Sequence, residues 1–179
     1  MCIAMAGRGG LGVIHRYNTI DDQQRMIESL YNQISNVAVA IGVSDDFKDR
    51  ARACVASGAS TLCIDVAHGH HALVEGAIKT LKDKYGENVH VMAGNVATLD
   101  AFNDLSDWGA DSIRVGVGGG SICSTRIQTG HGVPTLQSVI DCSKTDRNAL
   151  LIADGGFKTS GDVVNCLLYT SPRPRDGLL

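Results

Sequence analysis

The chain has 179 residues, a hydrophobic content of 44% and a formal net charge of −3. This composition is sufficient for a buried core and excludes a disordered tail, and the slight negative charge excludes a basic nucleic-acid binder. No apolar run is long enough to span a bilayer, and the apolar residues 1–6 are too few for a signal peptide. We therefore expect one cytoplasmic domain, without a nucleic-acid or membrane partner.

The cysteine and histidine spacing indicates neither a metal site nor a disulfide framework. The six cysteines form no C-x-x-C pair and have no zinc-ligand spacing. Most of them are predicted to be small apolar core residues. Of the scattered histidines, His15 is interpreted as structural, and His70 and His71 as solvated residues at the start of a helix.

Short apolar runs alternate with amphipathic helical patterns along the chain. The expected strands are 11–15, 37–43, 61–66, 89–93, 112–117 and 149–153. The expected helices are 20–33, 45–57, 72–85, 99–108, 135–143 and 160–168. Strands that are apolar on both faces indicate a parallel sheet, either a closed (β/α)8 barrel or an open doubly wound sheet. Polar motifs follow several different strands, which favours the barrel.

Residues 115–126 place a single cysteine, Cys123, in a loop rich in glycine and hydroxyl groups, directly after an expected strand. The glycines allow backbone conformations in which N–H and C=O groups turn toward a ligand. Many strand-to-helix turns are rich in glycine, and a buried cysteine often only fills space. The loop alone therefore leaves both a catalytic and a structural role open for Cys123.

Five further blocks accompany this loop in a fixed order, namely 9–15, 65–69, 93–98, 153–156 and 160–162. Together they resemble the IMP dehydrogenase/GMP reductase family over residues 1–168. The resemblance implies a (β/α)8 TIM barrel that is incomplete here, with about six βα units that correspond to strands two to seven. Residues 169–179 have no regular period and depart from the family, so we interpret them as a disordered or artefactual tail on a fragment truncated at both ends.

The resemblance implies that Cys123 attacks C2 of a purine nucleotide and forms a thioimidate, and that Thr125 relays a proton. A thiolate suits this role because it is a strong nucleophile at neutral pH. Ser121 and the N–H group of Gly156 match phosphate-binding groups, and Asp154 matches a carboxylate that accepts both ribose hydroxyls. From the residues alone, Asp154 could instead cap a turn.

The dinucleotide side of the family's site is matched by Asp65, His68, Asn95 and Arg114, with NADPH or NAD as the cofactor. From the residues alone, Asp65 and Asn95 could instead order their own turns. The resemblance also implies a potassium site, formed by the carbonyl groups of Gly118, Gly120 and Cys123. Its further ligands in the family come from segments that this sequence lacks.

Two features favour a GMP reductase, which converts GMP and NADPH to IMP and ammonia. No CBS pair is inserted between the expected helix 20–33 and the strand 37–43, and Thr129-Gly130 resembles the reductase loop. His131 and Thr135 are typical of neither enzyme. The alternatives are an IMP dehydrogenase, which converts IMP and NAD to XMP, a non-catalytic purine-nucleotide-binding barrel and an inactive fragment. The family implies a homotetramer at full length, and we expect the fragment alone to be inactive.

Overall fold

The computed structural model describes residues 1–30, 32–44 and 46–170. Asp45, the first residue of an expected helix, lies outside the described residues, as does most of the expected tail. The chain forms two compact units. Unit 1 comprises Met1–Val66 and His71–Ala93, and unit 2 comprises Ala67–His70 and Gly94–Leu179.

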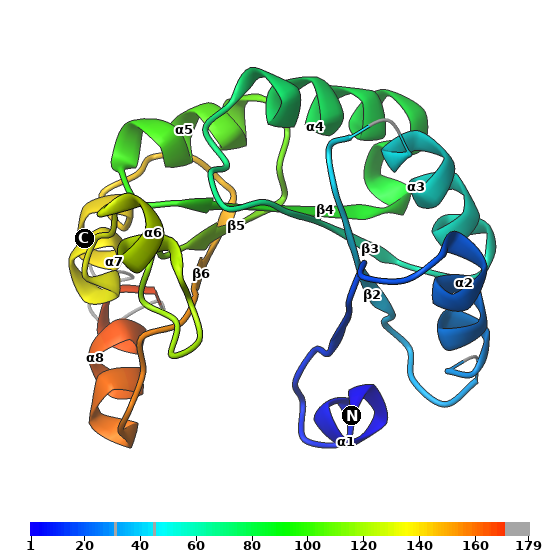
Figure 1. Cartoon of the computed structure of the whole chain (residues 1–179), viewed down its shortest axis with the longest axis horizontal. Coiled ribbons are helices and arrows are strands. Elements are labelled where there is room, and N and C mark those ends of the chain that lie inside the picture. Colours follow the sequence, from blue (N-terminus) through cyan, green and yellow to red (C-terminus); the bar gives the residue numbers. More distant parts are fainter. Residues whose placement is uncertain (31, 45, 171–179) are drawn as a thin grey trace, which may run out of the picture. The chain divides into compact units, whose positions relative to one another are not determined.

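Unit 1 consists of helices that follow short parallel strands. Its elements are α1 (Cys2–Ala6), β1 (Val13–Ile14), α2 (Ile20–Glu28), β2 (Ala38–Ile41), α3 (Phe47–Ala56), β3 (Thr61–Asp65), α4 (Ala72–Tyr85) and the 3-10 helix η1 (Gly86–Asn88). β2 lies between β1 and β3 and pairs in parallel with both. All four residues of β2 are buried, because apolar side chains cover both of its faces. Helices α2 and α3 pack side by side (Figure 1).

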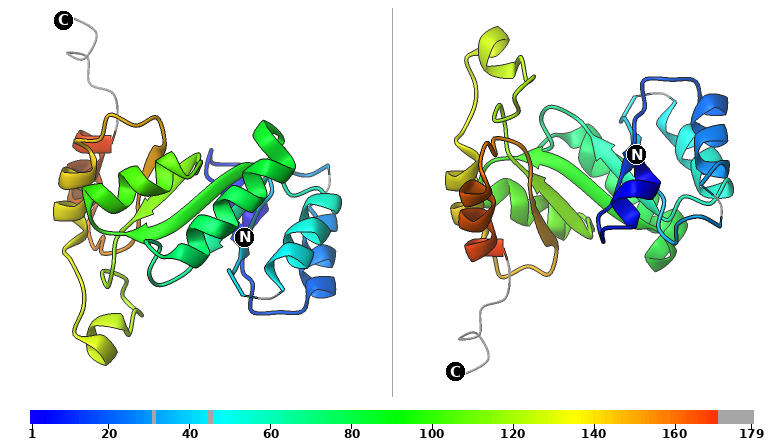
Figure 2. Two further views of the ribbon diagram at one scale, coloured as in Figure 1. Left: turned by 90° about the horizontal axis from the view of Figure 1, so that it is seen from above. Right: turned by 90° about the horizontal axis from the view of Figure 1, so that it is seen from below.

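Strand β4 begins in unit 1 and ends in unit 2, which also holds the elements that follow it. Their bounds are β4 (His90–Val96), α5 (Leu99–Asp107), β5 (Ser112–Val115), α6 (Thr125–Thr129), α7 (Thr135–Cys142), β6 (Leu150–Ala153) and α8 (Ser160–Thr170). β5 and β6 pair in parallel, with Ser112 opposite Leu150. Helices α7 and α8 lie side by side in both views of Figure 2 and pack against β6.

Within the described residues, the strands form one six-stranded sheet in chain order, from β1 to β6. The predicted alternation of strands and helices is confirmed, and the sheet has six strands rather than the eight of a closed barrel. None of the described helices is both long and apolar enough to cross a membrane.

Several predicted boundaries were wrong. Helix α2 ends at Glu28 rather than at residue 33, and Asn32 has a φ of 62°, which no right-handed helix contains. The short helices α1 and α6 were not predicted, since five residues are too few to show a helical period. Helix α8 continues to Thr170, two residues beyond its expected end at residue 168.

Candidate active site

The loop that follows β5 and the loop that follows β6 pack closely against each other in unit 2. Gly116, just after β5, has a φ of 146°, and its N–H group donates to Val96 O at 2.9 Å. A Cβ atom at Gly116 would collide with the carbonyl oxygen of Asp154. Only glycine allows this approach, which brings the loop of Cys123 against the loop of Asp154.

Cys123 is half-buried, and its Sγ lies 3.3 Å from Oγ1 of Thr125 in a hydrogen bond. The Thr125 hydroxyl and then the Thr125 backbone hold the pKa of the Cys123 thiol below its ordinary value. Partial burial acts in the opposite direction, and the Gly118 backbone and the Arg126 charge lower the pKa further. These surroundings favour the thiolate, the nucleophilic form of cysteine.

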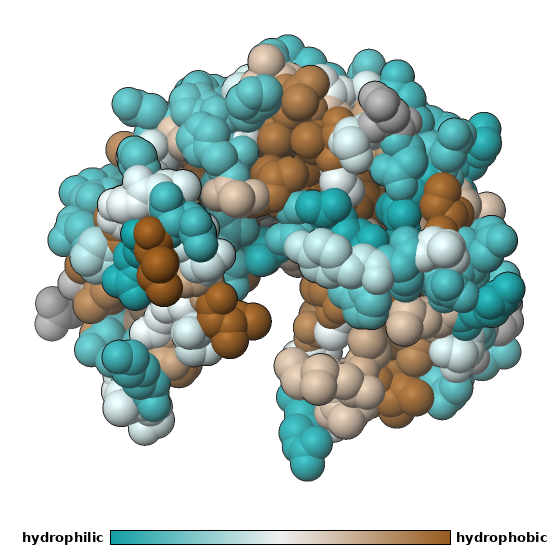
Figure 3. Space-filling view, viewed as in Figure 1, coloured by the Kyte–Doolittle hydropathy of each residue, from teal (hydrophilic) through white to brown (hydrophobic). Residues whose placement is uncertain are grey.

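The residues beside Cys123 expose apolar surface. Ile122 is 98% exposed and Ile127, in α6, is 84% exposed. Figure 3 shows hydrophobic atoms at the surface in the region of α6. An exposed apolar side chain next to a nucleophile suits a flat ring that buries it on binding.

Asp154 is held by two donors from neighbouring strands. Its Oδ2 accepts a hydrogen bond from Nδ2 of Asn95 at 2.6 Å and one from Nη2 of Arg114 at 2.8 Å. The Asn95 amide also donates to Gly116 O at 2.8 Å. Both groups donate to Oδ2 of Asp154, and neither of them donates to Oδ1. The carboxylate is therefore oriented by side chains and is more than a turn cap.

The structure brings together residues that were predicted for two different ligands. Asn95 and Arg114 were predicted on the dinucleotide side, and they bond directly to Asp154, which was predicted on the ribose side. His68 is exposed on the 67–70 loop, which Gly69 joins to Asn95 through an N–H···O bond of 2.8 Å. Asp65 ends β3 in unit 1, whereas the other predicted site residues belong to unit 2.

The two predicted phosphate-binding groups, Ser121 and Gly156, are both exposed. Gly156 has a φ of 83° and lies beside Gly119, whose Cβ position would be 3.6 Å from Gly156 N. Thr135 lies between these glycines and was not predicted to have a role, because its sequence context shows only the start of a helix. It is 7% exposed, and its Oγ1 has no hydrogen-bond partner.

The predicted potassium site consists of the carbonyl groups of Gly118, Gly120 and Cys123, and the structure holds no ion that would test it. Gly120 O accepts the N–H of Cys123 at 3.1 Å. Among the described residues, no three His, Cys, Asp or Glu side chains gather as they would around a metal ion. The predicted potassium ligands are backbone carbonyl groups rather than such side chains, so the potassium site stays a prediction.

Comparison with known proteins shows the family to which the chain belongs. A family model for the IMP dehydrogenase / GMP reductase domain matches residues 1–171. The chain belongs to this family. A GMP reductase from Leishmania major is 43% identical over 152 residues, which are 83% of this chain and 29% of the relative. An inosine-5'-monophosphate dehydrogenase from Staphylococcus aureus is 46% identical over 133 residues, which are 73% of this chain and 27% of the relative.

A solved member of the family has the same fold. The crystal structure of inosine 5'-monophosphate dehydrogenase from Legionella pneumophila matches with a TM-score of 0.85 and 41% identity. The match covers 95% of this chain and 51% of the solved chain, and the chain spans less than a third of the two curated relatives. The fold is therefore that of the family's TIM barrel, of which this chain supplies six βα units.

Proposed function

We propose that the chain belongs to a purine-nucleotide oxidoreductase in which Cys123 attacks C2 of the purine ring. The observation that supports this role best is the environment of Cys123, where the Thr125 hydroxyl lowers the pKa of the thiol. The other described cysteines with a resolved shift behave differently, because burial raises the pKa of Cys54, Cys142 and Cys166. Cys123 is the one of these four suited to covalent chemistry at neutral pH.

With GMP as substrate, the Cys123 thiolate adds to C2, and the amino group leaves as ammonia after it gains a proton. Thr125 lies close enough to the sulfur to pass on that proton, which a base or solvent must replace. The product of this step is a thioimidate between Sγ and C2. When bound, NADPH would supply the hydride that replaces sulfur at C2 and yields IMP, whereas in the alternative dehydrogenase reaction NAD would accept a hydride from C2. GMP, NADPH and one proton thus give IMP, NADP+ and ammonia.

The remaining site residues would hold the ligands. Asp154 accepts the ribose hydroxyls, and Arg114 and Asn95 keep its carboxylate in place. Ser121 and Gly156 are exposed residues, and the Ser121 hydroxyl and the Gly156 N–H can donate to the nucleotide phosphate. The exposed imidazole of His68 can stack on a flat ring of the dinucleotide, next to Asn95. Asp65 stays a predicted dinucleotide contact.

We propose GMP reduction as the direction. Helix α2 ends at Glu28 and β2 begins at Ala38, so no CBS pair lies in this connection. Thr129-Gly130 also resembles the reductase loop. The similarity of the relatives does not decide between the two, since the reductase is 43% and the dehydrogenase 46% identical. A homotetramer, a cytoplasmic location and the potassium ion remain predictions that come from the family alone.

Covalent trapping tests the nucleophile without a cofactor. A 2-chloropurine ribonucleotide should lose chloride to Cys123, and mass spectrometry should find the added nucleotide on the peptide of residues 115–126. Cys123→Ser should remain unlabelled. Labelling of other cysteines instead would contradict the proposed nucleophile.

Spectrophotometry tests the direction. In a full-length protein that contains this chain, we expect oxidation of NADPH with GMP to be faster than reduction of NAD with IMP. The opposite order would establish the IMP dehydrogenase alternative. Trapping at Cys123 without turnover in either direction would fit an inactive fragment, and nucleotide binding without trapping would fit a non-catalytic barrel.

A further inference from the structure

The loop that carries Cys123 begins and ends at one point in unit 2. Val117 and Val133 form an antiparallel bridge, in which the Val133 N–H group donates to Val117 O at 3.0 Å. Residues 118–132 therefore form a loop whose two ends lie side by side, a geometry in which the loop's own side chains usually provide its packing. The position of Cys123 within this loop depends on what holds the two ends together.

The side chain of Arg126 lies against both ends of this loop. Its Cγ atom is 2.7 Å from the position that a Cβ atom would take at Gly118 and 2.5 Å from that position at Gly132. A side chain at either glycine would therefore collide with the Arg126 stem. The two backbones are also close to each other, since the Gly118 Cβ position is 3.2 Å from Gly132 Cα. The glycines thus leave room for an unbranched methylene stem, and Arg126 fills it.

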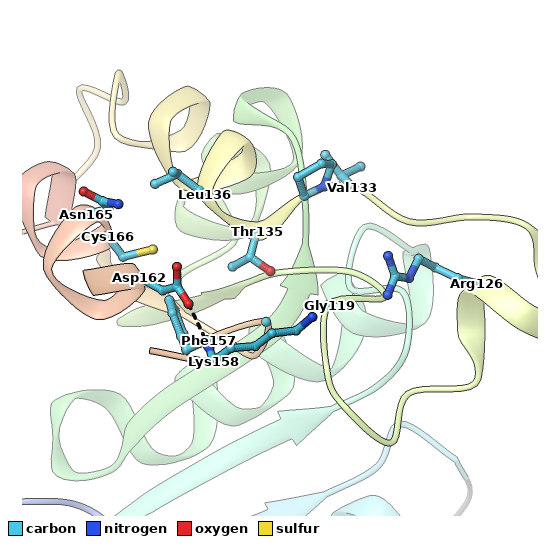
Figure 4. Close-up of a pocket in the computed structure, with 12 residues that line it drawn as sticks. Gly119, Arg126, Val133, Thr135, Leu136, Phe157, Lys158, Asp162, Asn165 and Cys166 are labelled. Carbon is cyan, nitrogen blue, oxygen red and sulfur yellow. Dashed lines mark hydrogen bonds between the residues drawn. The ribbon is translucent and has the colours of Figure 1, made fainter. Parts of the chain in front are cut away.

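Packing of this stem, rather than a salt bridge, holds Arg126 in place. Among the described residues, its guanidinium group has no ion-pair partner. Figure 4 shows this group directed from α6 toward the pocket that Gly119 and Thr135 line. Arginine can bury its methylene groups while its charged end stays in water, so its replacement by alanine removes packing as well as charge.

The packing of Arg126 is linked to the reacting group through α6. Arg126 follows Thr125 in the first turn of this helix, and the N–H group of Gly130 donates to Arg126 O at 3.0 Å where the helix ends. Cys123 comes just before the helix, and its Sγ bonds to Thr125 Oγ1 at 3.3 Å. A shift of Arg126 would therefore move the turn that places Cys123 beside the Thr125 hydroxyl.

We propose that Arg126 is a positioning residue, whose stem holds the loop in the conformation that places the Cys123 sulfur beside the Thr125 hydroxyl. The inference rests on the proposed function only where it concerns attack on C2 of the purine. The Thr125 hydroxyl makes the largest contribution to the lowered pKa of the Cys123 thiol, and the Arg126 charge makes the smallest. Since the hydroxyl's contribution depends on the position that the stem maintains, the stem matters more than the charge.

Alkylation of Cys123 in the 179-residue chain, with a Cys2→Ala background, tests this role. Arg126→Ala should shift the pH dependence of the iodoacetamide rate to higher pH, because the loosened loop no longer holds the Thr125 hydroxyl at the sulfur. Arg126→Met keeps an unbranched stem and removes the charge, so its profile should stay close to that of the wild type. Arg52→Ala, which removes an exposed arginine of unit 1, is the control.

A second variant tests the same contact from the opposite side. Gly132→Ala places a Cβ atom 2.5 Å from Arg126 Cγ, at a glycine without a left-handed backbone conformation. It should therefore displace the stem and shift the alkylation profile as Arg126→Ala does. The double variant Arg126→Ala, Gly132→Ala should shift it no further, since the two changes act on one contact. Gly76→Ala, at an α4 glycine whose Cβ position is open, is the control.

Trapping of the 2-chloropurine ribonucleotide measures the consequence for the proposed reaction. Arg126→Ala should slow trapping at Cys123 about tenfold or more, and Arg126→Met should stay within about twofold of the wild type, because a displacement of about 1 Å can cost about a hundredfold in rate. Thermal unfolding shows which variants are folded. If Arg126→Ala does not fold, Gly132→Ala and Arg126→Met carry the test.

Alkylation profiles like that of the wild type in Arg126→Ala and Gly132→Ala, even with lower unfolding temperatures, would overturn the positioning role. Equal shifts in Arg126→Met and Arg126→Ala would overturn the role of the stem and assign the effect to the charge. The proposed function fails separately. A wild type that is not trapped at Cys123, with a shifted alkylation profile in Arg126→Ala, would leave only the positioning role, whereas equal trapping of the wild type and all variants would leave only the proposed function.

Discussion

Cys123 differs chemically from the buried cysteines because hydrogen-bond donors surround its sulfur. The Thr125 hydroxyl makes the largest contribution to the lowered pKa of its thiol. Because the folded-state pKa is lowered, the thiolate is present at a lower pH than in the unfolded chain. The same side chain that is proposed to relay a proton thus also tunes the nucleophile.

Removing the Thr125 hydroxyl should therefore slow alkylation of Cys123. In a Cys2→Ala background, we expect Thr125→Val to raise the pKa of Cys123 and to reduce its rate with iodoacetamide at pH 7 several-fold. The measurement is the alkylation rate as a function of pH. Thr129→Val is the control, because the Thr129 hydroxyl donates to Thr125 O at 2.7 Å and does not contact the sulfur. An unchanged pH profile in Thr125→Val would show that the hydroxyl does not stabilise the thiolate.

Asp154→Ala should weaken binding of a ribonucleotide by roughly 1.5–3 kcal/mol, because charge-assisted bonds to the ribose hydroxyls are lost. The comparison of GMP with its 2'-deoxy analogue makes the test specific. The wild type should prefer GMP, and Asp154→Ala should lose most of that preference, as measured by calorimetry. The control is Asp83→Ala, which removes an exposed carboxylate of α4. This variant should keep the preference for GMP over the 2'-deoxy analogue. Equal preference in Asp154→Ala and the wild type would assign the carboxylate a purely structural role.

Among the secondary-structure elements, a buried polar network joins α2 and α3 to the strands beneath them. Gln23 of α2 is fully buried, and its Nε2 donates to His15 O at 3.1 Å and to Ala40 O at 2.9 Å. Its Oε1 accepts from Nη1 of Arg50 at 2.9 Å, and Arg50 is 8% exposed. One glutamine thus satisfies two backbone carbonyls and part of a buried cation.

Gln23→Leu should lower the free energy of unfolding by about 3 kcal/mol, because it leaves Arg50 and two carbonyls with fewer partners. Urea unfolding followed by circular dichroism measures the loss. Gln24→Leu is the matched control, since Gln24 is only partly buried and donates to Ser57 Oγ at 3.0 Å, and it should cost about 1 kcal/mol or less. The double variant Gln23→Leu, Arg50→Met should recover part of the loss. Equal losses in Gln23→Leu and Gln24→Leu would contradict the role of the network.

Over the whole molecule, the sequence predicted the parts of the fold that depend on a repeating pattern. All six strands were expected near their observed positions. A parallel strand that is buried on both faces appears in the sequence as a continuous run of apolar residues, as at β3. β1 is shorter than expected, with two residues at one edge of the sheet. The helices α1 and α6 have five residues each, which is too short to show a helical period in the sequence.

The sequence indicated which residues belong to the candidate site, but not which of them form hydrogen bonds with one another. Cys123 and Thr125 are two residues apart, so their proximity follows from the sequence. The bonds of Asp154 to Asn95 and Arg114 span 59 and 40 residues, and they depend on how three strands align. Thr135 left no signal, since a hydroxyl at the start of a helix usually serves the helix itself.

Buried thiols in both units make the free energy of unfolding depend on pH. Burial raises the pKa of Cys54 in unit 1 and of Cys142 in unit 2 from 9.0 to about 11. A raised folded-state pKa leaves stability intact below pH 9, where both states keep the proton. Between pH 9 and 11 only the unfolded chain loses it, so the free energy of unfolding falls over this range.

We expect the loss to be roughly 2 kcal/mol per thiol, measured as the shift of the urea midpoint from pH 8.5 to about 11 under reducing conditions. A Cys54→Ala, Cys142→Ala double variant should be less stable than the wild type at neutral pH, because it leaves two small cavities. Between pH 8.5 and about 11, however, its free energy of unfolding should fall by less than that of the wild type. Cys2→Ala, which changes a half-buried thiol, should follow the wild type. The wild type, the double variant and Cys2→Ala share all other groups that titrate between pH 9 and 11. A difference between them in the slope of the free energy of unfolding against pH therefore comes from Cys54 and Cys142. If the double variant lost as much stability between pH 9 and 11 as the wild type, the alkaline transition would belong to lysine and tyrosine side chains instead.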